Sequence, residues 1–223
     1  MPTIDRSAWL KEKRRLSEER MDTLWAPIYD QNWGAVIDPT HARCLNRILD
    51  LCPPQAVVLD AACGTGKYWP SILASGRTIF GMDQSWGMLS CAQAKYPDVL
   101  VEKRGLQEMI YEARFDSAIC MDAMEYIPPE DWLVVLKNLY RALKPQAYLY
   151  FTVEVADEKE VEQAFTAGQA LGLPVVYGEW AHEEGYHYYP PSEQVTKWIK
   201  YASFHLVAEI FGDEYQHYLV QKL

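Results

Sequence analysis

The feature that most constrains this chain is an apolar strand that ends in an acidic residue and leads into a turn of small residues. Residues 57–67 read Val-Val-Leu-Asp-Ala-Ala-Cys-Gly-Thr-Gly-Lys, and a second strand, residues 78–83, also ends in an acid, Asp83. The interval from Asp60 to Asp83 suits one βαβ unit, and small residues let the backbone approach a ligand closely. A carboxylate at the tip of the second strand can accept hydrogen bonds from both ribose hydroxyls. The two segments therefore predict a nucleoside pocket.

Composition favours one compact domain that spans residues 1–223. The chain has 223 residues, 49% of them hydrophobic, which is enough to bury one large core. Its formal net charge of −10 opposes binding to nucleic-acid phosphates. No apolar stretch is long enough to cross a bilayer, and residues 1–15 lack the apolar core of a secretory signal. The five cysteines show no CxxC spacing, which predicts reduced thiols. We expect a cytoplasmic protein with no nucleic-acid or membrane partner.

Strand and helix patterns alternate along most of the chain. Further strands are predicted at residues 99–102, 115–121 and 147–153, and residues 205–211 and 215–221 predict a hairpin that turns at Gly212-Asp213. These patterns predict an α/β fold: a Rossmann-like, doubly wound, mostly parallel seven-stranded sheet with a C-terminal antiparallel hairpin and helices on both faces.

Two segments lie outside this regular pattern. Residues 6–28 predict a helix whose charged side chains form i,i+4 pairs on a solvated face, within an N-terminal helical lid of about residues 1–37. Residues of about 155–191 predict a substrate-side insertion, made of one helix and a loop rich in Gly, Pro, aromatic and acidic residues.

Four motifs in register resemble those of class I S-adenosylmethionine-dependent methyltransferases of the small-molecule type. They are Val-Leu-Asp-Ala-Ala-Cys-Gly-Thr-Gly at 58–66, Gly-Met-Asp-Gln-Ser at 81–85, Phe-Asp-Ser-Ala-Ile-Cys-Met at 115–121 and Tyr-Arg-Ala-Leu-Lys-Pro at 140–145. Two positions depart from the family pattern, because Ala62 and Gln146 stand where that pattern commonly has glycine. The resemblance implies that S-adenosyl-L-methionine is the cofactor and that a small molecule accepts the methyl group.

The resemblance also implies which residues bind the cofactor. Asp60 would organise the loop near the cofactor's ammonium group, and Asp83 would bind the ribose. The other implied cofactor-binding residues are Tyr29, Ala62, Gly64, Gly66, Gln84, Met88, Leu106, Gln107 and Met121. Tyr29 would fold over the cofactor, where an aromatic face favours a sulfonium cation. For several of these residues, ordinary turn formation or core packing remains the alternative.

Residues that handle the acceptor are sought beyond the fourth and fifth strands and in the insertion. His187 is the first choice for a general base, and Glu154 is the second because it directly follows the fifth strand. His182, Glu183 and His187 are similar to a zinc-protease helix, but their spacing is one residue too long and Gly185 interrupts the helix. We therefore predict no metal site.

Three functions remain open. The first is methyl transfer from S-adenosylmethionine to an oxygen or nitrogen atom of a small metabolite. A protein or RNA methyltransferase is the alternative enzyme, and the acidity of the chain disfavours it. A dehydrogenase would require a G-x-G-x-x-G fingerprint, which the turn at residues 62–67 does not match. A protein that binds S-adenosylmethionine without turnover is the non-enzymatic alternative.

Overall fold

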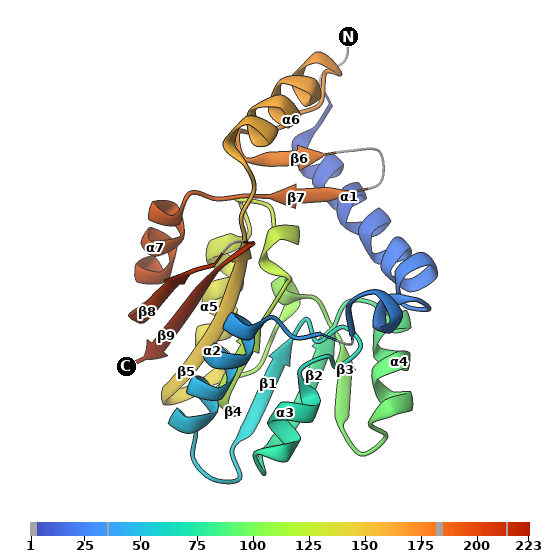
Figure 1. Cartoon of the computed structure of the whole chain (residues 1–223). Helices are drawn as coiled ribbons and strands as arrows, with labels where there is room; N and C mark the ends of the chain where they lie inside the picture. Colours follow the sequence, from blue (N-terminus) through green and yellow to red (C-terminus); the bar gives the residue numbers. More distant parts are fainter. Residues whose placement is uncertain (1–3, 35, 182–184, 213) are drawn as a thin grey trace.

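The computed structural model describes residues 4–34, 36–181, 185–212 and 214–223. Seven strands form one sheet in the order β3-β2-β1-β4-β5-β9-β8 (Figure 1). These strands are β1 (Val57–Ala61), β2 (Thr78–Asp83), β3 (Leu100–Lys103), β4 (Phe115–Cys120), β5 (Leu143–Glu154), β8 (Phe204–Phe211) and β9 (Tyr215–Lys222). Strands β1 to β5 are parallel to one another, whereas β9 is antiparallel to both β5 and β8. The predicted fold class is confirmed.

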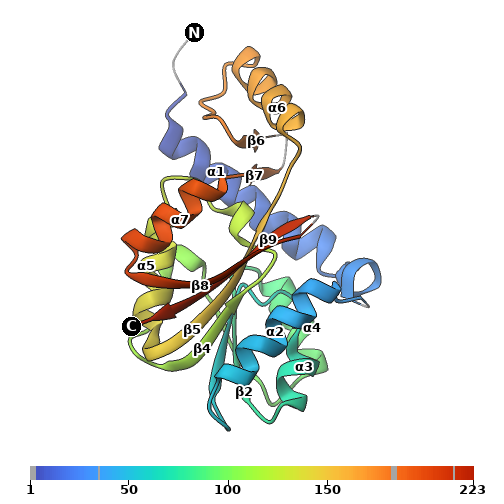
Figure 2. The ribbon, with the colours of Figure 1, turned by 60° about the vertical axis from the view of Figure 1, so that its left-hand side comes forward.

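Helices cover both faces of this sheet because both faces are apolar. Along β1, Val58 packs into the cluster on one face and Leu59 into the cluster on the other. Figure 2 shows the sheet nearly edge-on between the two helical layers. One layer consists of α2 (Pro39–Leu51), α3 (Trp69–Ala74) and α4 (Trp86–Lys95), and the other of α5 (Trp132–Ala142) and α7 (Ser192–Tyr201).

The N-terminal segment is less regular than the predicted single helix. Helix α1 (Arg6–Arg20) is followed by two π-helical turns, η1 (Met21–Trp25) and η2 (Asp30–Gly34). Asp22 accepts a hydrogen bond at 2.8 Å from the backbone N–H of Gly87 at the start of α4, which fixes η1 there. In Figure 1, α1 crosses above the carboxyl ends of the parallel strands.

The insertion contains two short strands where the sequence predicted only a loop. Helix α6 (Glu158–Ala170) is capped by Asp157, whose side chain accepts from the Lys159 N–H, and β6 (Glu179–Ala181) pairs antiparallel with β7 (Tyr186–Tyr188). The Glu179 side chain is fully buried and accepts a hydrogen bond from the Tyr186 hydroxyl at 2.6 Å, so the pairing has a polar anchor that local sequence patterns do not reveal. His182, Glu183 and Asp213 lie outside the described residues.

Two 3₁₀ turns complete the carboxyl edge of the sheet. They are η3 (Leu106–Glu108), after β3, and η4 (Met124–Tyr126), after β4. No helix in the described part of the chain has both the length and the apolar character needed to cross a membrane.

Candidate functional site

A cavity of about 600 Å³ lies at the carboxyl edge of the sheet and is called the edge cavity here. Its floor comes from the segments that follow β1, β2, β3 and β4, which in a parallel sheet converge at one edge. Its roof comes from α1, whose Leu10, Arg14 and Ser17 belong to the lining. The sequence therefore predicted the position of this cavity correctly.

Asp83 lies in the wall of the edge cavity and is only 9% exposed. One carboxylate oxygen accepts from the backbone N–H of Gly64 at 2.9 Å and the other from that of Ser85 at 2.8 Å. Burial raises the pKa of Asp83 to about 6, although these backbone donors act in the opposite direction. A carboxylate has about four acceptor positions, so capacity remains for two ligand hydroxyls.

The turn after β1 requires backbone that glycine adopts most easily. Ala62, Gly64 and Gly66 all have positive φ angles, of 64°, 52° and 80°. Ala62 and Gly64 line the edge cavity, and a Cβ on Gly64 would meet nothing within 4 Å, so a ligand can approach the backbone there. Gly66 does not line the cavity. A Cβ on Gly66 would lie 2.7 Å from the ring of Trp69, so this glycine permits helix packing.

Asp60 lies beneath the turn and not in the cavity wall. Its Oδ2 accepts a hydrogen bond from the indole N–H of Trp69 at 2.8 Å. Burial raises the pKa of Asp60 to about 7, against the effect of the Trp69 hydrogen bond, and the charges of Asp83 and Asp122 contribute to the rise. The Asp60 carboxylate thus holds Trp69, the first residue of α3, beneath the turn and does not line the edge cavity.

The other predicted cofactor residues come together around the edge cavity. Gln84, Met88, Leu106, Gln107 and Met121 all belong to its lining. The backbone carbonyls of Leu106 and Gln107 each accept from the Asn138 amide at 3.0 Å, which holds the η3 turn in place. The chain therefore offers apolar side chains and a fixed backbone at the place where the base of a nucleoside ligand is expected.

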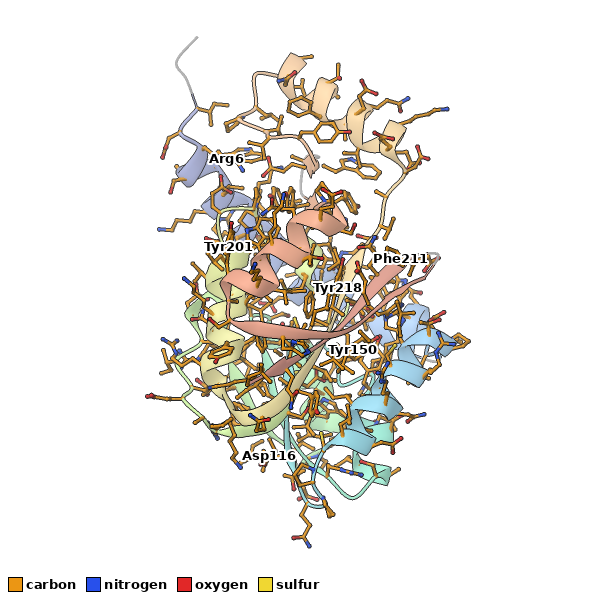
Figure 3. All side chains as sticks on the ribbon, turned by 90° about the vertical axis from the view of Figure 1, so that its left-hand side faces the viewer. Arg6, Asp116, Tyr150, Tyr201, Phe211 and Tyr218 are labelled. Atoms are coloured by element: carbon orange, nitrogen blue, oxygen red, sulfur yellow. The ribbon has the colours of Figure 1, made fainter. Side chains whose placement is uncertain are left out.

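The roof is held by charges that sequence spacing had assigned to a solvated face. Arg14 pairs with Glu108 across the cavity, rather than with Glu18 on its own helix. Arg6 reaches the buried carboxylate of Glu179 at 2.7 Å and also pairs with Glu130. Figure 3 shows Arg6 on α1 near the insertion. These pairs join α1 to both sides of the cavity, which corrects the sequence interpretation for Arg14, whereas the exposed i,i+4 pair between Arg15 and Glu19 forms as predicted, at 2.9 Å.

A second cavity of about 890 Å³ adjoins the first and is called the side cavity. It lies between the N-terminus of α2, the β8–β9 hairpin and β7, and it includes Phe211, labelled in Figure 3. Among the described residues, eight line both cavities and form the shared wall: Ser17, Met21, Tyr29, Lys67, Tyr68, Asp122, Tyr126 and Tyr186. A ligand in one cavity would therefore lie beside a ligand in the other at these shared residues.

Asp122 is the functional candidate that sequence analysis missed. It follows β4 with a φ of 54°, a conformation that is rare for aspartate and typical of strained functional positions. His41 Nε2 lies 2.9 Å from its Oδ1, and the Tyr68 hydroxyl donates to its Oδ2 at 2.6 Å. Burial opposes ionisation, but these two partners hold the pKa of Asp122 below its usual value. Asp122 therefore carries a negative charge in the shared wall.

His41 is held between two carboxylates and is not a free base. Its second ring nitrogen, Nδ1, lies 3.3 Å from Asp38 Oδ1, so carboxylates face both nitrogens. Burial favours the neutral ring, yet the hydrogen bond and charge of Asp122, with a smaller effect of Asp38, raise the pKa of His41 above its usual value. Asp38 also caps α2, because its carboxylate accepts from the Thr40 and His41 N–H groups.

The two predicted catalytic residues lie beside each other. His187 lines the side cavity, whereas Glu154 lines neither cavity. His187 Nδ1 is 3.3 Å from Glu154 Oε2 and 2.9 Å from the Tyr189 hydroxyl, and its ring meets Tyr126 edge-on at 4.8 Å. Burial raises the pKa of Glu154 above its usual value. Glu154 Oε2 therefore lies within ion-pair distance of the His187 ring but has no hydrogen-bond partner among the described residues, and the Tyr189 hydroxyl is the nearer group to Nδ1.

Comparison with known proteins links this geometry to one family. Residues 58–146 match the family described as "Methyltransferase domain". The methyltransferase YqeM of Bacillus subtilis is 33% identical over 107 residues, which cover 45% of this chain and 43% of YqeM. A ubiquinone biosynthesis O-methyltransferase of Histophilus somni is 27% identical over 145 residues, 60% of each chain. This chain thus spans less than two thirds of either relative.

A solved structure shares the fold over most of the chain. The magnesium protoporphyrin IX methyltransferase ChlM of Synechocystis, crystallised with bound SAH, superposes with a TM-score of 0.70 at 14% identity. The match covers 95% of this chain and 100% of that chain. At this identity, the likeness shows a common fold.

Proposed function

We propose that this chain, which belongs to the class I S-adenosylmethionine-dependent methyltransferases, transfers a methyl group to an oxygen or nitrogen atom of a small metabolite. Its enzyme class and its cofactor, S-adenosylmethionine, follow from the family. The single observation that supports a small-molecule acceptor is the pair of adjoining cavities with a shared wall. Both the ubiquinone-pathway relative and ChlM are named for small-molecule substrates, which supports a small acceptor.

The residues of the edge cavity fit the cofactor. Asp83 has acceptor positions left for the two ribose hydroxyls, and the open space at Gly64 admits a ligand against the backbone. Met88, Leu106 and Met121 supply apolar contacts for the base and the methionine chain. When bound, the cofactor supplies an electrophilic methyl group on a sulfonium centre. The roof formed by α1 excludes water from it.

The shared wall is where the chain would align the two ligands. The negative charge of Asp122 attracts a cationic sulfonium, and the ring of Tyr29 offers a second favourable contact. Holding acceptor and methyl group in line is the main gain available to such an enzyme. We therefore assign the edge cavity to the cofactor and the side cavity to the acceptor.

His187 and Glu154 are proposed to receive the proton of an acceptor that begins as O–H or N–H. His187 lines the side cavity, and Glu154 at 3.3 Å from its Nδ1 would stabilise the protonated ring. This arrangement of a base and a nearby carboxylate is common in proton-transfer sites.

The two irregular segments are proposed to enclose the ligands. The N-terminal segment to about residue 37 is proposed as the lid, and the insertion of about residues 155–191 is proposed as the substrate side. Within the insertion, Gly185, Tyr186 and His187 line the side cavity.

One experiment tests the function directly. The protein is incubated with S-adenosylmethionine that carries a deuterated methyl group and with a metabolite extract, and products are followed by mass spectrometry. We expect one small compound to gain the labelled methyl group, and no gain with Asp83→Ala. Label on protein or RNA would support the alternative enzyme. Cofactor binding without any labelled product would support a non-catalytic protein.

A further inference from the structure

Arg6, the first residue of α1, reaches a buried acid of the insertion. Its two terminal nitrogens donate to the Glu179 carboxylate, at 3.0 and 2.7 Å, and one of them also donates to the Pro174 carbonyl. The Glu179 side chain is 0% exposed, so bulk water does not reach this carboxylate. Removing one partner of a buried ion pair leaves the other charge uncompensated, which is strongly unfavourable. The structure of the insertion therefore depends on a residue of α1.

Glu179 is the hydrogen-bonding centre of the insertion. Besides the two bonds from Arg6, its oxygens accept from the Tyr186 hydroxyl at 2.6 Å and from the backbone N–H of Val176 at 2.7 Å. A carboxylate has about four acceptor positions, and these four bonds fill them. Tyr186 lies on β7, opposite Ala181 of β6. The polar anchor of the β6–β7 pair is therefore complete only while α1 is in place.

The elements joined by this contact both line ligand cavities. Helix α1 forms the roof of the edge cavity. On β7, Tyr186 lines both cavities and His187 lines the side cavity. The Trp9 ring of α1 meets the Tyr186 ring edge-on at 6.0 Å, and Figures 1 and 2 show β7 beside α1. The roof of the edge cavity is thus attached to one wall of the side cavity.

A second contact attaches α1 beside the η3 turn. Arg14 forms two hydrogen bonds to the Glu108 carboxylate, at 2.6 and 2.5 Å. A Cβ on Gly105 would overlap the Arg14 guanidinium, so the glycine leaves the space that this pair needs. Leu106 and Gln107 of the same turn line the edge cavity. A ligand in the edge cavity would therefore lie between η3 and α1 and would add contacts that hold α1 in this position.

We propose that Arg6 is a positioning residue that couples the two cavities. A ligand in the edge cavity holds α1 in place, which keeps Arg6 on Glu179 and keeps β7 at the side cavity. Cofactor binding therefore favours acceptor binding, and by reciprocity an acceptor strengthens cofactor binding. The assignment rests on the function proposed above, because it concerns the same two cavities.

Hydrogen exchange followed by mass spectrometry tests this coupling with S-adenosylhomocysteine alone. The reporter is residues 174–181, which include β6 and line neither cavity, so a ligand acts on them only through other residues. In wild type we expect saturating S-adenosylhomocysteine to slow exchange there by at least about fivefold. Residues 204–210 of β8, at the far edge of the sheet, should respond less and measure any general stabilisation.

Two variants and a matched control locate the coupling. Arg6→Gln and Glu179→Gln both break the buried pair, and each should lose most of the ligand-dependent slowing in residues 174–181. Arg15→Gln should retain it, because this arginine of the same helix pairs only with exposed Glu12 and Glu19 of α1 itself. If Arg6 were merely structural, Arg6→Gln would speed exchange equally with and without ligand, and the ratio would not change.

Three results would overturn the coupling. They are unchanged exchange in residues 174–181 when S-adenosylhomocysteine binds wild type, slowing that persists in either Arg6→Gln or Glu179→Gln, and slowing that Arg15→Gln also loses. The wild-type measurement requires no variant, so misfolding of a variant leaves the test intact. If labelled methyl transfer occurs but the insertion does not respond, only the coupling fails. If calorimetry detects no S-adenosylhomocysteine binding to wild type, the proposed function and the coupling fail together.

Discussion

Asp83→Ala removes the carboxylate that we expect to bind the cofactor ribose. Hydrogen bonds to a charged group are worth ~1.5–3 kcal/mol, so loss of even one costs at least about tenfold in affinity. The structure adds a second effect, because Asp83 also accepts from the backbone N–H groups of Gly64 and Ser85. The variant therefore removes ligand contacts and also loosens the turn after β1.

A double comparison separates these two effects. Calorimetry gives the affinity of wild type and Asp83→Ala for S-adenosylhomocysteine and for its 2′,3′-dideoxy analogue, which lacks the hydroxyls. If Asp83 acts through the ribose, the variant loses at least about tenfold for the natural ligand and much less for the analogue. An equal loss for both ligands would mean that Asp83 only supports the loop. Unchanged affinity for S-adenosylhomocysteine would refute the ribose assignment altogether.

Three further predictions concern proton transfer, backbone strain and pH. His187→Ala should lower the methylation rate by about 10²–10⁴-fold while calorimetric cofactor affinity survives, and an unaltered rate would remove its assigned role. Gln146→Gly should raise the melting temperature by about 2 °C, because Gln146 has a φ of 67°; melting below the Gln146→Ala control would contradict this. Asp60 has a folded-state pKa of about 7 against 3.8 for the free group, so wild-type stability should fall, by on the order of a few kcal/mol, as pH rises from about 4 to 7. Denaturant titration of Asp60→Asn, in which this decrease should be smaller because only the contribution of Asp83 and other buried acids remains, provides the comparison.

The sheet and the edge cavity could be predicted because their signals are local. An apolar strand that ends in an acid is visible in a few residues, and parallel strands bring such ends together. The same rule also explains an omission. Asp122 stands just after the predicted end of β4, but the neighbouring Met121 was chosen for its apolar character. Had the search for acidic residues at strand ends included the residue after the predicted end of β4, it would have found Asp122 as the third carboxylate at this edge.

Contacts between distant residues could not be predicted. His41 reaches Asp122 across 81 positions and Arg14 reaches Glu108 across 94, whereas sequence spacing identifies only neighbours on one helix. For the same reason the α1 charges were expected to face solvent. The buried Glu179 that anchors β6 and β7 is another such case, since it pairs with Arg6 from the opposite end of the chain.

The two departures from the family's glycine pattern turned out to be informative. Ala62 and Gln146 both have positive φ angles, 64° and 67°, so the chain keeps the backbone conformation that glycine adopts without strain. The sequence showed which residues differ, but only the structure shows that both lie in the left-handed region that favours glycine.

The central claim is that cofactor and acceptor meet across the shared wall of two cavities. A crystal structure with S-adenosylhomocysteine tests it most directly. We expect the ribose hydroxyls on the Asp83 carboxylate, and the sulfur directed at the wall formed by Tyr29, Asp122 and Tyr126. A sulfur atom that points away from the side cavity, or a ligand bound outside the edge cavity, would contradict the account.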